Sequence, residues 1–518
     1  MKKYLLSLFV LLFLFSGCTA KKTPDPIDDN YRVFYEIFTG SFSDSNKDGI
    51  GDLKGIINRL DYLNDGDINS GKSLGIQGIW LTPIFKSPSY HKYDVTDYYE
   101  IDPDFGTMED LKELIEECHK RNVKLILDMV INHTSVNNEW FLRFKEARQK
   151  GNTSDPYYDF YTCVTQDEME SGHTYHRLQN TAFYYEGNFS GEMPELNYDN
   201  WDVRNAVLDV AKYYLDLGID GFRFDAAKYI YFTDNSKSIN FWNWYIGKLK
   251  EYKPDIYTVA EVWSSDNETI SYVKGLNCFA FSMSQAEGMI ANTARSGNVN
   301  VFSNYVDQYL QKIKAQNPDA MMIPFISNHD MDRCAGFLTI ITGHAYIGAN
   351  LYLLCSGSPF IYYGEEIGLK GSRGSANTDA NRRLAMLWGD GDTVADPEGT
   401  TFEAKKQTNG TVADQIKNPD SLYNYYCKVI AFRNRYPQIA RGDYSMYYLK
   451  DTSMGGFTID YNDEKSFLIH NTSTLEQSID LNGYELKPSE IVEYIGLNEA
   501  RYENGVLTIG PQTSVLLK

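Results

Sequence analysis

The chain has 518 residues, more than a single hydrophobic core usually organises, so we expect one large domain with a smaller inserted or appended one. Its formal net charge is −21. Nucleic acids and other polyanions bind through clustered Lys and Arg, so this acidity argues against a nucleic-acid partner.

The first eighteen residues have the pattern of an export signal. Two lysines precede an apolar run over residues 4–15, which is short for a membrane span and typical of a secretory signal. Two small residues and Cys18 follow, and together they resemble a bacterial lipoprotein cleavage box; a plain cleaved signal is the alternative. We predict a signal peptide over residues 1–18, lipidation at Cys18 and a tether over residues 19–30. The protein would be exported and anchored to a membrane, at the cell surface or facing the periplasm.

From residue 31 onward, short apolar runs alternate with helix-like stretches, which is the pattern of βα units around a parallel sheet. We expect an α/β fold, a (β/α)8 TIM barrel. Its eight strands would lie at residues 33–38, 78–82, 124–130, 221–225, 256–261, 278–283, 323–327 and 359–363.

Two segments depart from the barrel pattern. Residues 134–200, after the third strand, form too long a connection for a compact barrel and predict an inserted subdomain. Residues 441–518 show short alternating strands broken by Asn-Gly and Asn-Asp turns, which predict a C-terminal antiparallel β domain, a sandwich. The barrel would then comprise residues 31–133 and 201–440.

Acidic residues lie at or near the ends of four of these segments, at Asp128, Asp225, Glu261 and Asp330. Catalytic groups of a parallel barrel lie where strands end, and acidic residues are poor strand formers. Each acid alone could be a helix cap. Arg223 precedes Asp225 by two residues, so both would point to the same side of the strand. A guanidinium there would hold Asp225 ionised, as a nucleophile requires.

Four segments around these acids resemble the four signature regions of the α-amylase family of glycoside hydrolases, in the family's order. They are Asp128-Met-Val-Ile-Asn-His133, Gly221-Phe-Arg-Phe-Asp-Ala-Ala-Lys228, Glu261-Val-Trp263 and Phe325-Ile-Ser-Asn-His-Asp330. In addition, Met193-Pro-Glu-Leu-Asn197 resembles a fifth signature, found in members intermediate between α-amylases and oligo-1,6-glucosidases.

The resemblance implies a role for each acid. Asp225 would be the nucleophile, Glu261 the general acid and base, and Asp330 the group that grips and distorts the reacting sugar. A retaining glycosidase places two carboxyl groups about 5 Å apart, and the acid must be protonated while the nucleophile is not. Burial beside Trp263 and the charges of Asp225 and Asp330 would raise the pKa of Glu261. The implied substrate contacts are Tyr93, Asp94, His133, Arg223, Lys228, Trp263 and His329.

Residues 44–52 offer oxygen ligands at alternate positions, and hard oxygen donors at that spacing suit Ca²⁺. The loop lacks the Glu that closes an EF-hand, and an ordinary Asp-Gly turn is the alternative. It resembles the calcium loop after the first strand in several subfamilies, which implies a structural Ca²⁺ with no part in bond cleavage. The implied ligands are Asp44, Asn46, Asp48, Ile50 and Asp52.

The resemblance implies a retaining endo-α-1,4-glucan hydrolase, an α-amylase that acts outside the cell on starch and maltooligosaccharides. The same glycosyl-enzyme would also serve a 4-α-glucanotransferase or an oligo-1,6-glucosidase. A non-catalytic starch-binding lipoprotein is a third reading, which retention of all three acids disfavours. We expect a monomer whose partners are the glucan and, through the lipid anchor, a membrane.

Overall fold

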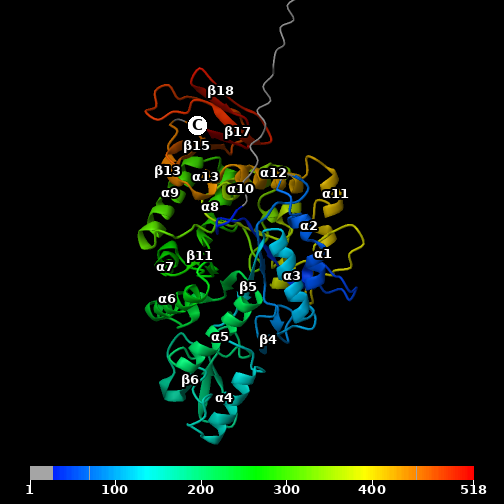
Figure 1. Ribbon diagram of the computed structural model, residues 1–518, viewed down its shortest axis with the longest axis vertical. Coiled ribbons are helices and arrows are strands. Elements are labelled where there is room, and N and C mark those ends of the chain that lie inside the picture. The colour runs from blue at the N-terminus through cyan, green and yellow to red at the C-terminus, as the bar shows by residue number, and fades with distance from the viewer. Residues whose placement is uncertain (1–26, 69, 451) are drawn as a thin grey trace, which may run out of the picture.

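The computed structural model describes residues 27–68, 70–450 and 452–518, and it contains a parallel barrel, an insertion and a C-terminal β domain (Figure 1). The predicted signal peptide, Cys18 and residues 19–26 of the tether lie outside the described residues. The helices that are described are all too short or too polar to cross a membrane.

Residues 27–30, which the sequence assigned to the tether, pack against the barrel. Ile27 is buried, and its carbonyl oxygen accepts hydrogen bonds from Arg32 and Asn122, each at 2.8 Å. Asp29 forms an ion pair with Arg441 at 2.6 Å. Residues 27–30 are therefore part of the folded body and not of a tether.

The described part of the chain contains a parallel sheet of seven strands, in the order β11-β10-β9-β5-β2-β1-β12. Five of these strands are buried along their whole length, as expected where the barrel interior and the helices cover both faces. The strands are β1 (Phe34–Ile37), β2 (Gly78–Leu81), β5 (Lys124–Met129), β9 (Gly221–Phe224), β10 (Tyr257–Ala260), β11 (Asn277–Cys278) and β12 (Phe360–Tyr362).

The seventh predicted strand, at residues 323–327, is not a regular strand. It forms an isolated parallel bridge between Ile323 and Phe279, and the backbone N–H of Phe360 donates to the Pro324 carbonyl at 3.0 Å. Pro324 has no N–H and cannot continue a ladder. This irregular segment nevertheless closes the barrel between β11 and β12.

The sixth predicted strand also differs from expectation. Only its start pairs, as β11, and the chain then turns into the 3-10 helix η4 (Phe281–Met283). The shortness of β11 and the irregularity of the next segment leave the barrel least regular on this side.

Helices cover the outside of the sheet, and α3 (Met108–Lys120) illustrates why. Thr107 and Asp110 form a capping box, and Leu111 and Leu114 lie on the buried face. The other helices are α1 (Leu53–Asn58), α2 (Leu60–Leu63), α5 (Trp201–Leu217), α6 (Asn235–Tyr252), α7 (Asp266–Tyr272), α8 (Met289–Ser296), α9 (Val299–Gln316), α10 (His344–Leu353), α11 (Val412–Lys417), α12 (Leu422–Arg435) and α13 (Pro437–Arg441).

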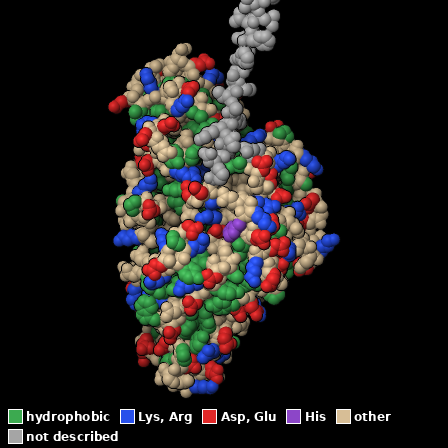
Figure 2. Space-filling view, in the orientation of Figure 1, with side chains coloured by type: hydrophobic (Ala, Val, Ile, Leu, Met, Phe, Trp, Pro, Cys, Tyr) green, Lys and Arg blue, Asp and Glu red, His purple; other side chains and the backbone are tan. Residues whose placement is uncertain are grey.

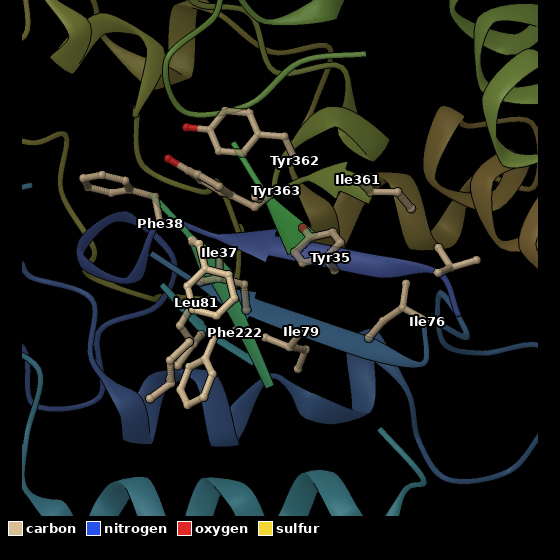
Figure 3. Close-up of a cluster of buried hydrophobic side chains, with 14 of the residues drawn as sticks. Tyr35, Ile37, Phe38, Ile76, Ile79, Leu81, Phe222, Ile361, Tyr362 and Tyr363 are labelled. Atoms are coloured by element: carbon tan, nitrogen blue, oxygen red, sulfur yellow. The ribbon is translucent and has the colours of Figure 1, made fainter. Parts of the chain in front are cut away.

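The core is divided by the barrel wall. Side chains such as Phe34, Trp80 and Tyr257 form a cluster apart from the larger one. The larger cluster includes Ile79 and Leu81, which point from β2 toward the surrounding helices in Figure 3. A packed interior of this kind leaves the ends of the strands as the place for chemistry.

The insertion contains α4 (Glu139–Lys150) and an antiparallel sheet of β6 (Cys163–Thr165), β8 (Phe183–Glu186) and β7 (Tyr175–Arg177). It protrudes from one end of the molecule in Figure 1. Its return segment is pinned to the chain just after β5, because the Leu196 N–H donates to the Asn132 carbonyl at 3.1 Å. A short hairpin of β3 (Phe85–Lys86) and β4 (Asp97–Ile101) precedes α3.

The C-terminal domain consists of two antiparallel sheets with an apolar cluster of their own, which includes Leu449, Phe467, Leu507 and Val515. The five-stranded sheet has the order β13 (Asp443–Tyr447), β14 (Gly455–Tyr461), β15 (Glu464–Asn471), β20 (Thr513–Leu517) and β17 (Ile491–Gly496). The three-stranded sheet has the order β16 (Gln477–Asp480), β19 (Val506–Ile509) and β18 (Ala500–Glu503).

Barrel closure depends on Gly357, which precedes β12 with φ +95°, where an added Cβ would overlap the Met322 carbonyl oxygen. We expect Gly357→Ala to lower the free energy of unfolding by about 3 kcal/mol, because strain and overlap add. Gly247→Ala, on an exposed part of α6 with nothing within 4 Å, should instead raise it by about 0.5–1 kcal/mol. Urea unfolding of both variants measures this, and equal midpoints would contradict the tight closure.

Candidate active site

The buried guanidinium of Arg223 is the centre of the candidate site. Its Nη1 donates to both oxygens of Asp128, at 2.8 and 2.9 Å, and to Asp225 Oδ1 at 2.6 Å. Its Nη2 donates to Glu261 Oε2. Asp225 and Glu261 therefore bind one guanidinium and face the same space.

Strand register brings these groups together. Asp128 on β5 lies opposite Arg223 on β9, and β10 pairs with the other edge of β9 and leads into Glu261. Arg223 and Asp225 are two residues apart, so both point toward the barrel mouth. Ala226 then takes a left-handed conformation at φ 47°, which ends the strand directly after Asp225.

Asp330 and His329 form a second group beside the first. His329 is fully buried, its Nδ1 lies 2.6 Å from Glu36 Oε1, and its Nε2 lies 3.1 Å from Asp330 Oδ2. Arg383 Nη2 donates to Asp330 Oδ1 at 2.7 Å. Asp330 is thus held from two sides while a third of its side chain stays exposed.

Tyr93 links the two groups. Its hydroxyl donates to Asp128 Oδ2 at 2.9 Å and lies 2.6 Å from His329 Nε2, and its ring stacks on that of His329. The adjacent Asp94 is buried but accepts its hydrogen bonds from serines, such as Ser87 at 2.7 Å. Asp94 therefore borders the site without direct contact to the three acids.

His133 is buried, and its Nε2 has no hydrogen-bond partner among the described residues. Because an unpaired buried polar atom is costly, this nitrogen is available to a substrate hydroxyl. The exposed ring of Phe189, from the insertion, lies 5.3 Å from the His133 ring.

In the described part of the chain, Lys228 and Trp263 form their ring contacts with aromatic neighbours and not with the Arg223 cluster. Lys228 is half-buried, with its Nζ 5.0 Å from the centre of the Tyr229 ring. Trp263 is 39% exposed and stacks on Phe281 at 5.2 Å. Both side chains are partly exposed and therefore accessible to a bound sugar chain.

The surroundings of Glu261 and Asp330 shift the pKa values of these two acids in opposite directions. Burial raises the pKa of Glu261 to about 8, and the charges of Asp225 and Asp330 add to the effect against the attraction of Arg223. Burial would also disfavour ionisation of Asp330, but the charges of His329 and Arg383 outweigh it and hold the pKa of Asp330 well below its usual range. Asp330 and Glu36 raise the pKa of His329 to about 10, although burial opposes this. Near neutral pH, Glu261 therefore holds a proton while Asp330 is ionised.

Two residues of the site were not identified from the sequence. Glu36 lies in the first strand, and its carboxylate orients His329. It could have been found, because it is an acid inside an apolar strand, like the four that were recognised. Arg383 follows β12 in an irregular loop, and no local pattern connects it with Asp330.

In the predicted calcium loop, side-chain oxygens accept hydrogen bonds from backbone N–H groups of the same loop. Asp44 accepts the N–H of Asn46 at 3.0 Å, Asn46 that of Asp48 at 2.9 Å, and Asp48 that of Ile50 at 2.8 Å. Asp52 caps α1 through the Gly55 N–H at 2.7 Å. No group of three His, Cys, Asp or Glu side chains within the described ranges could hold a metal. The donors fit a hard cation only if amide and carbonyl oxygens join the carboxylates.

Comparisons with known proteins agree with this geometry. Residues 36–442, well over half of the chain, match the family model described as "Alpha amylase, catalytic domain". Alpha-amylase 3 of Dictyoglomus thermophilum is 35% identical over 94% of this chain and 93% of its own. The 4-alpha-glucanotransferase of Thermotoga maritima is 29% identical, with 88% and 98% covered. The oligo-1,6-glucosidase of Bacillus cereus is 30% identical, with 86% and 90% covered.

Solved structures give the same result. Eubacterium rectale Amy13B matches with a TM-score of 0.88 at 34% identity, over 96% of this chain and 97% of that one. An α-amylase from H. orenii matches with a TM-score of 0.82, also at 34% identity, over 94% and 99%. The fold is thus the TIM barrel of these amylases with a C-terminal antiparallel domain, as predicted. The chain therefore belongs to the α-amylase family of glycoside hydrolases.

Proposed function

We propose that this enzyme is a retaining endo-α-1,4-glucan hydrolase that acts outside the cell on starch and maltooligosaccharides. The observation that carries the proposal is the shared guanidinium: Asp225 and Glu261 both bind Arg223, so two carboxyl groups face one sugar position. Burial raises the pKa of Glu261 to about 8, which keeps a proton on this group near neutral pH. The 35% identity to an α-amylase over nearly the whole chain supports the choice of substrate.

The reaction follows from the site in two steps. Asp225 attacks the anomeric carbon as the glycosidic C–O bond breaks, and Glu261 gives its proton to the departing oxygen. Glu261, now a carboxylate, takes a proton from water, which displaces Asp225 from the same carbon and restores the α configuration. Asp330, ionised between His329 and Arg383, would bind sugar hydroxyls.

The assignment of the nucleophile is tested by Asp225→Asn, which removes the attacking oxygen's charge without changing its size. We expect kcat on starch to fall by at least about 10⁴-fold with the fold intact. Circular dichroism controls for folding, and Asp480→Asn, exposed on β16 of the C-terminal domain, should retain wild-type activity. Reducing-end release near the wild-type rate would show that another group attacks.

The pH profile tests the role of Glu261. The acid works only when protonated, and its pKa is about 8, so kcat/KM should be retained up to about pH 8. Above that value it should fall about tenfold per pH unit. With a glucosyl fluoride as substrate, the leaving group needs no proton. The rate of glycosyl-enzyme formation should then no longer fall above about pH 8. A decline that began near pH 5 would contradict a raised pKa at Glu261.

Transfer to a second sugar and cleavage of α-1,6 bonds are the alternative activities, because the same glycosyl-enzyme serves them. Relatives named 4-alpha-glucanotransferase and oligo-1,6-glucosidase cover most of this chain. The products formed from maltotriose distinguish α-1,4 hydrolysis from transfer. Products that are all shorter than maltotriose would support hydrolysis, and longer products would support transfer. Release of glucose from isomaltose would support the α-1,6 activity. Starch binding without any cleavage would support the non-catalytic alternative.

We also propose that residues 1–18 direct export and that Cys18 is lipidated. Expression of the full chain in a bacterial host with labelled palmitate should label the wild type and leave Cys18→Ser unlabelled. The variant should move from the membrane fraction to the soluble exported fraction. Equal labelling of both would contradict lipidation at Cys18.

We propose that residues 44–52 bind a structural Ca²⁺. The oxygens of Asp44, Asn46 and Asp48 and the carbonyl of Ile50 would hold the ion, with Asp52 fixing the loop to α1. Chelation should lower Tm by about 5 °C and leave initial rates unchanged, because the ion binds only the folded state. Asp48→Ala should show the lower Tm with or without calcium. An identical wild-type Tm in calcium and in chelator would contradict the site.

A further inference from the structure

Two tryptophans form an exposed aromatic corner on the outside of the barrel. Trp201, the first residue of α5, is 58% exposed, and its ring lies 5.5 Å from that of Trp244 on α6, at 87°. Figure 2 shows hydrophobic side chains gathered among charged ones on the face that carries α5. Tryptophan is highly buried on average, so an indole more than half exposed beside a second, half-buried indole indicates a surface that is used.

The guanidinium of Arg204 packs against both indole rings and restricts their movement. The Arg204 guanidinium lies 4.8 Å from the Trp201 ring and 5.4 Å from the Trp244 ring. Arg204 is itself fixed, because it donates to the Tyr198 carbonyl at 2.7 Å and to the Tyr231 hydroxyl at 2.9 Å. Side chains that are already ordered lose little entropy when a ligand binds.

Polar groups surround the aromatic pair. The Tyr231 hydroxyl donates to Asp199 Oδ1 at 2.8 Å, and Lys237 Nζ lies 3.4 Å from Asp199 Oδ2. A glucose ring presents an apolar C–H face and an edge of hydroxyls, so an aromatic platform with a polar rim is the surface that matches it.

The size of the apolar surface argues against a protein partner. Among the described residues, the exposed large hydrophobic side chains on α5 and α6 are Trp201 and Tyr252, and Tyr252 is the last residue of α6. A specific protein interface buries about 800 Å² on each partner, far more than two indoles offer. A linear sugar chain needs only such a platform.

The contacts of Trp201 and Trp244 in the described part of the chain are with each other and with Arg204, and not with the three acids, but Trp201 lies at the same end of the barrel as those acids. Each barrel helix begins where the preceding strand and its loop end, so the start of α5 lies toward the face that carries the catalytic acids. We propose that Trp201, Trp244 and their polar rim form an accessory site that binds α-glucan chains and holds polymeric substrate beside the active site. This rests on the proposed glucan substrate.

The test combines binding and catalysis in the full chain. In an Asp225→Asn background, Trp201→Ala should weaken co-sedimentation with insoluble starch by about tenfold, as the loss of one stacked ring predicts. In the active enzyme it should slow hydrolysis of insoluble starch several-fold and leave kcat/KM for maltotriose within twofold. Asn200 still caps α5 through the Asp202 N–H at 2.9 Å, so the variant should fold.

Three further variants complete the test: a conservative substitution, an aromatic control elsewhere on the surface, and removal of the second indole. Trp201→Phe should keep part of the starch binding, because a smaller ring remains. Tyr448→Ala removes a ring that is 56% exposed on the C-terminal side, and it should change neither binding nor catalysis. Trp244→Ala should weaken starch binding as Trp201→Ala does.

The outcomes separate this site from the proposed reaction. Unchanged starch binding by Trp201→Ala would overturn the accessory site, as would an equal loss of activity on maltotriose and on starch. Starch binding that depends on Trp201 in a wild-type protein that cleaves no glucan would support the site and overturn the hydrolase. A wild-type protein that neither binds nor cleaves starch would overturn both.

Discussion

A single buried cation governs the candidate site. Arg223 pairs with three carboxylates, Asp128, Asp225 and Glu261, so the cluster holds more negative than positive charge in a region shielded from water. Leaving all three ionised would be costly, because one guanidinium cannot compensate three buried anions. Burial raises the pKa of Asp128 to about 7 and that of Glu261 to about 8, so the cluster keeps a proton near neutral pH. The proton on Glu261 is the one that a departing glucan oxygen requires.

This arrangement depends on the register of three neighbouring strands. A shift of β9 by one residue against β5 would turn Arg223 and Asp225 away from the barrel mouth together, because side chains alternate between faces. The barrel that fixes this register closes through the irregular segment around Pro324. Gly357 packs against Met322, two residues before Pro324, so a larger side chain at Gly357 would disturb the closure on which the strand register depends.

Much of this could be predicted from sequence, for physical reasons that also set the limit. Acids that end apolar runs, such as Asp128 and Asp225, identify strand ends because a strand interior disfavours them. The capped, one-sided pattern of α3 is equally local. Arg383 could not be found, because its partner Asp330 is 53 residues away, with α10 and β12 between them, and the loop around Arg383 has no periodicity. The irregular strand at Pro324 was missed because hydrophobicity alone does not report hydrogen-bond pairing.

The insertion joins the active site to the proposed accessory site. The segment that returns from it donates the Leu196 N–H to Asn132, beside His133, and two residues later Tyr198 donates its hydroxyl to the Ile131 carbonyl. Trp201 follows three residues after Tyr198, whose own carbonyl accepts the hydrogen bond from Arg204 beneath the indoles. The path from His133 to Trp201 is therefore short and hydrogen-bonded throughout. A glucan held on the indoles would stay at a fixed distance from the catalytic acids, which a flexible appended binding module could not provide.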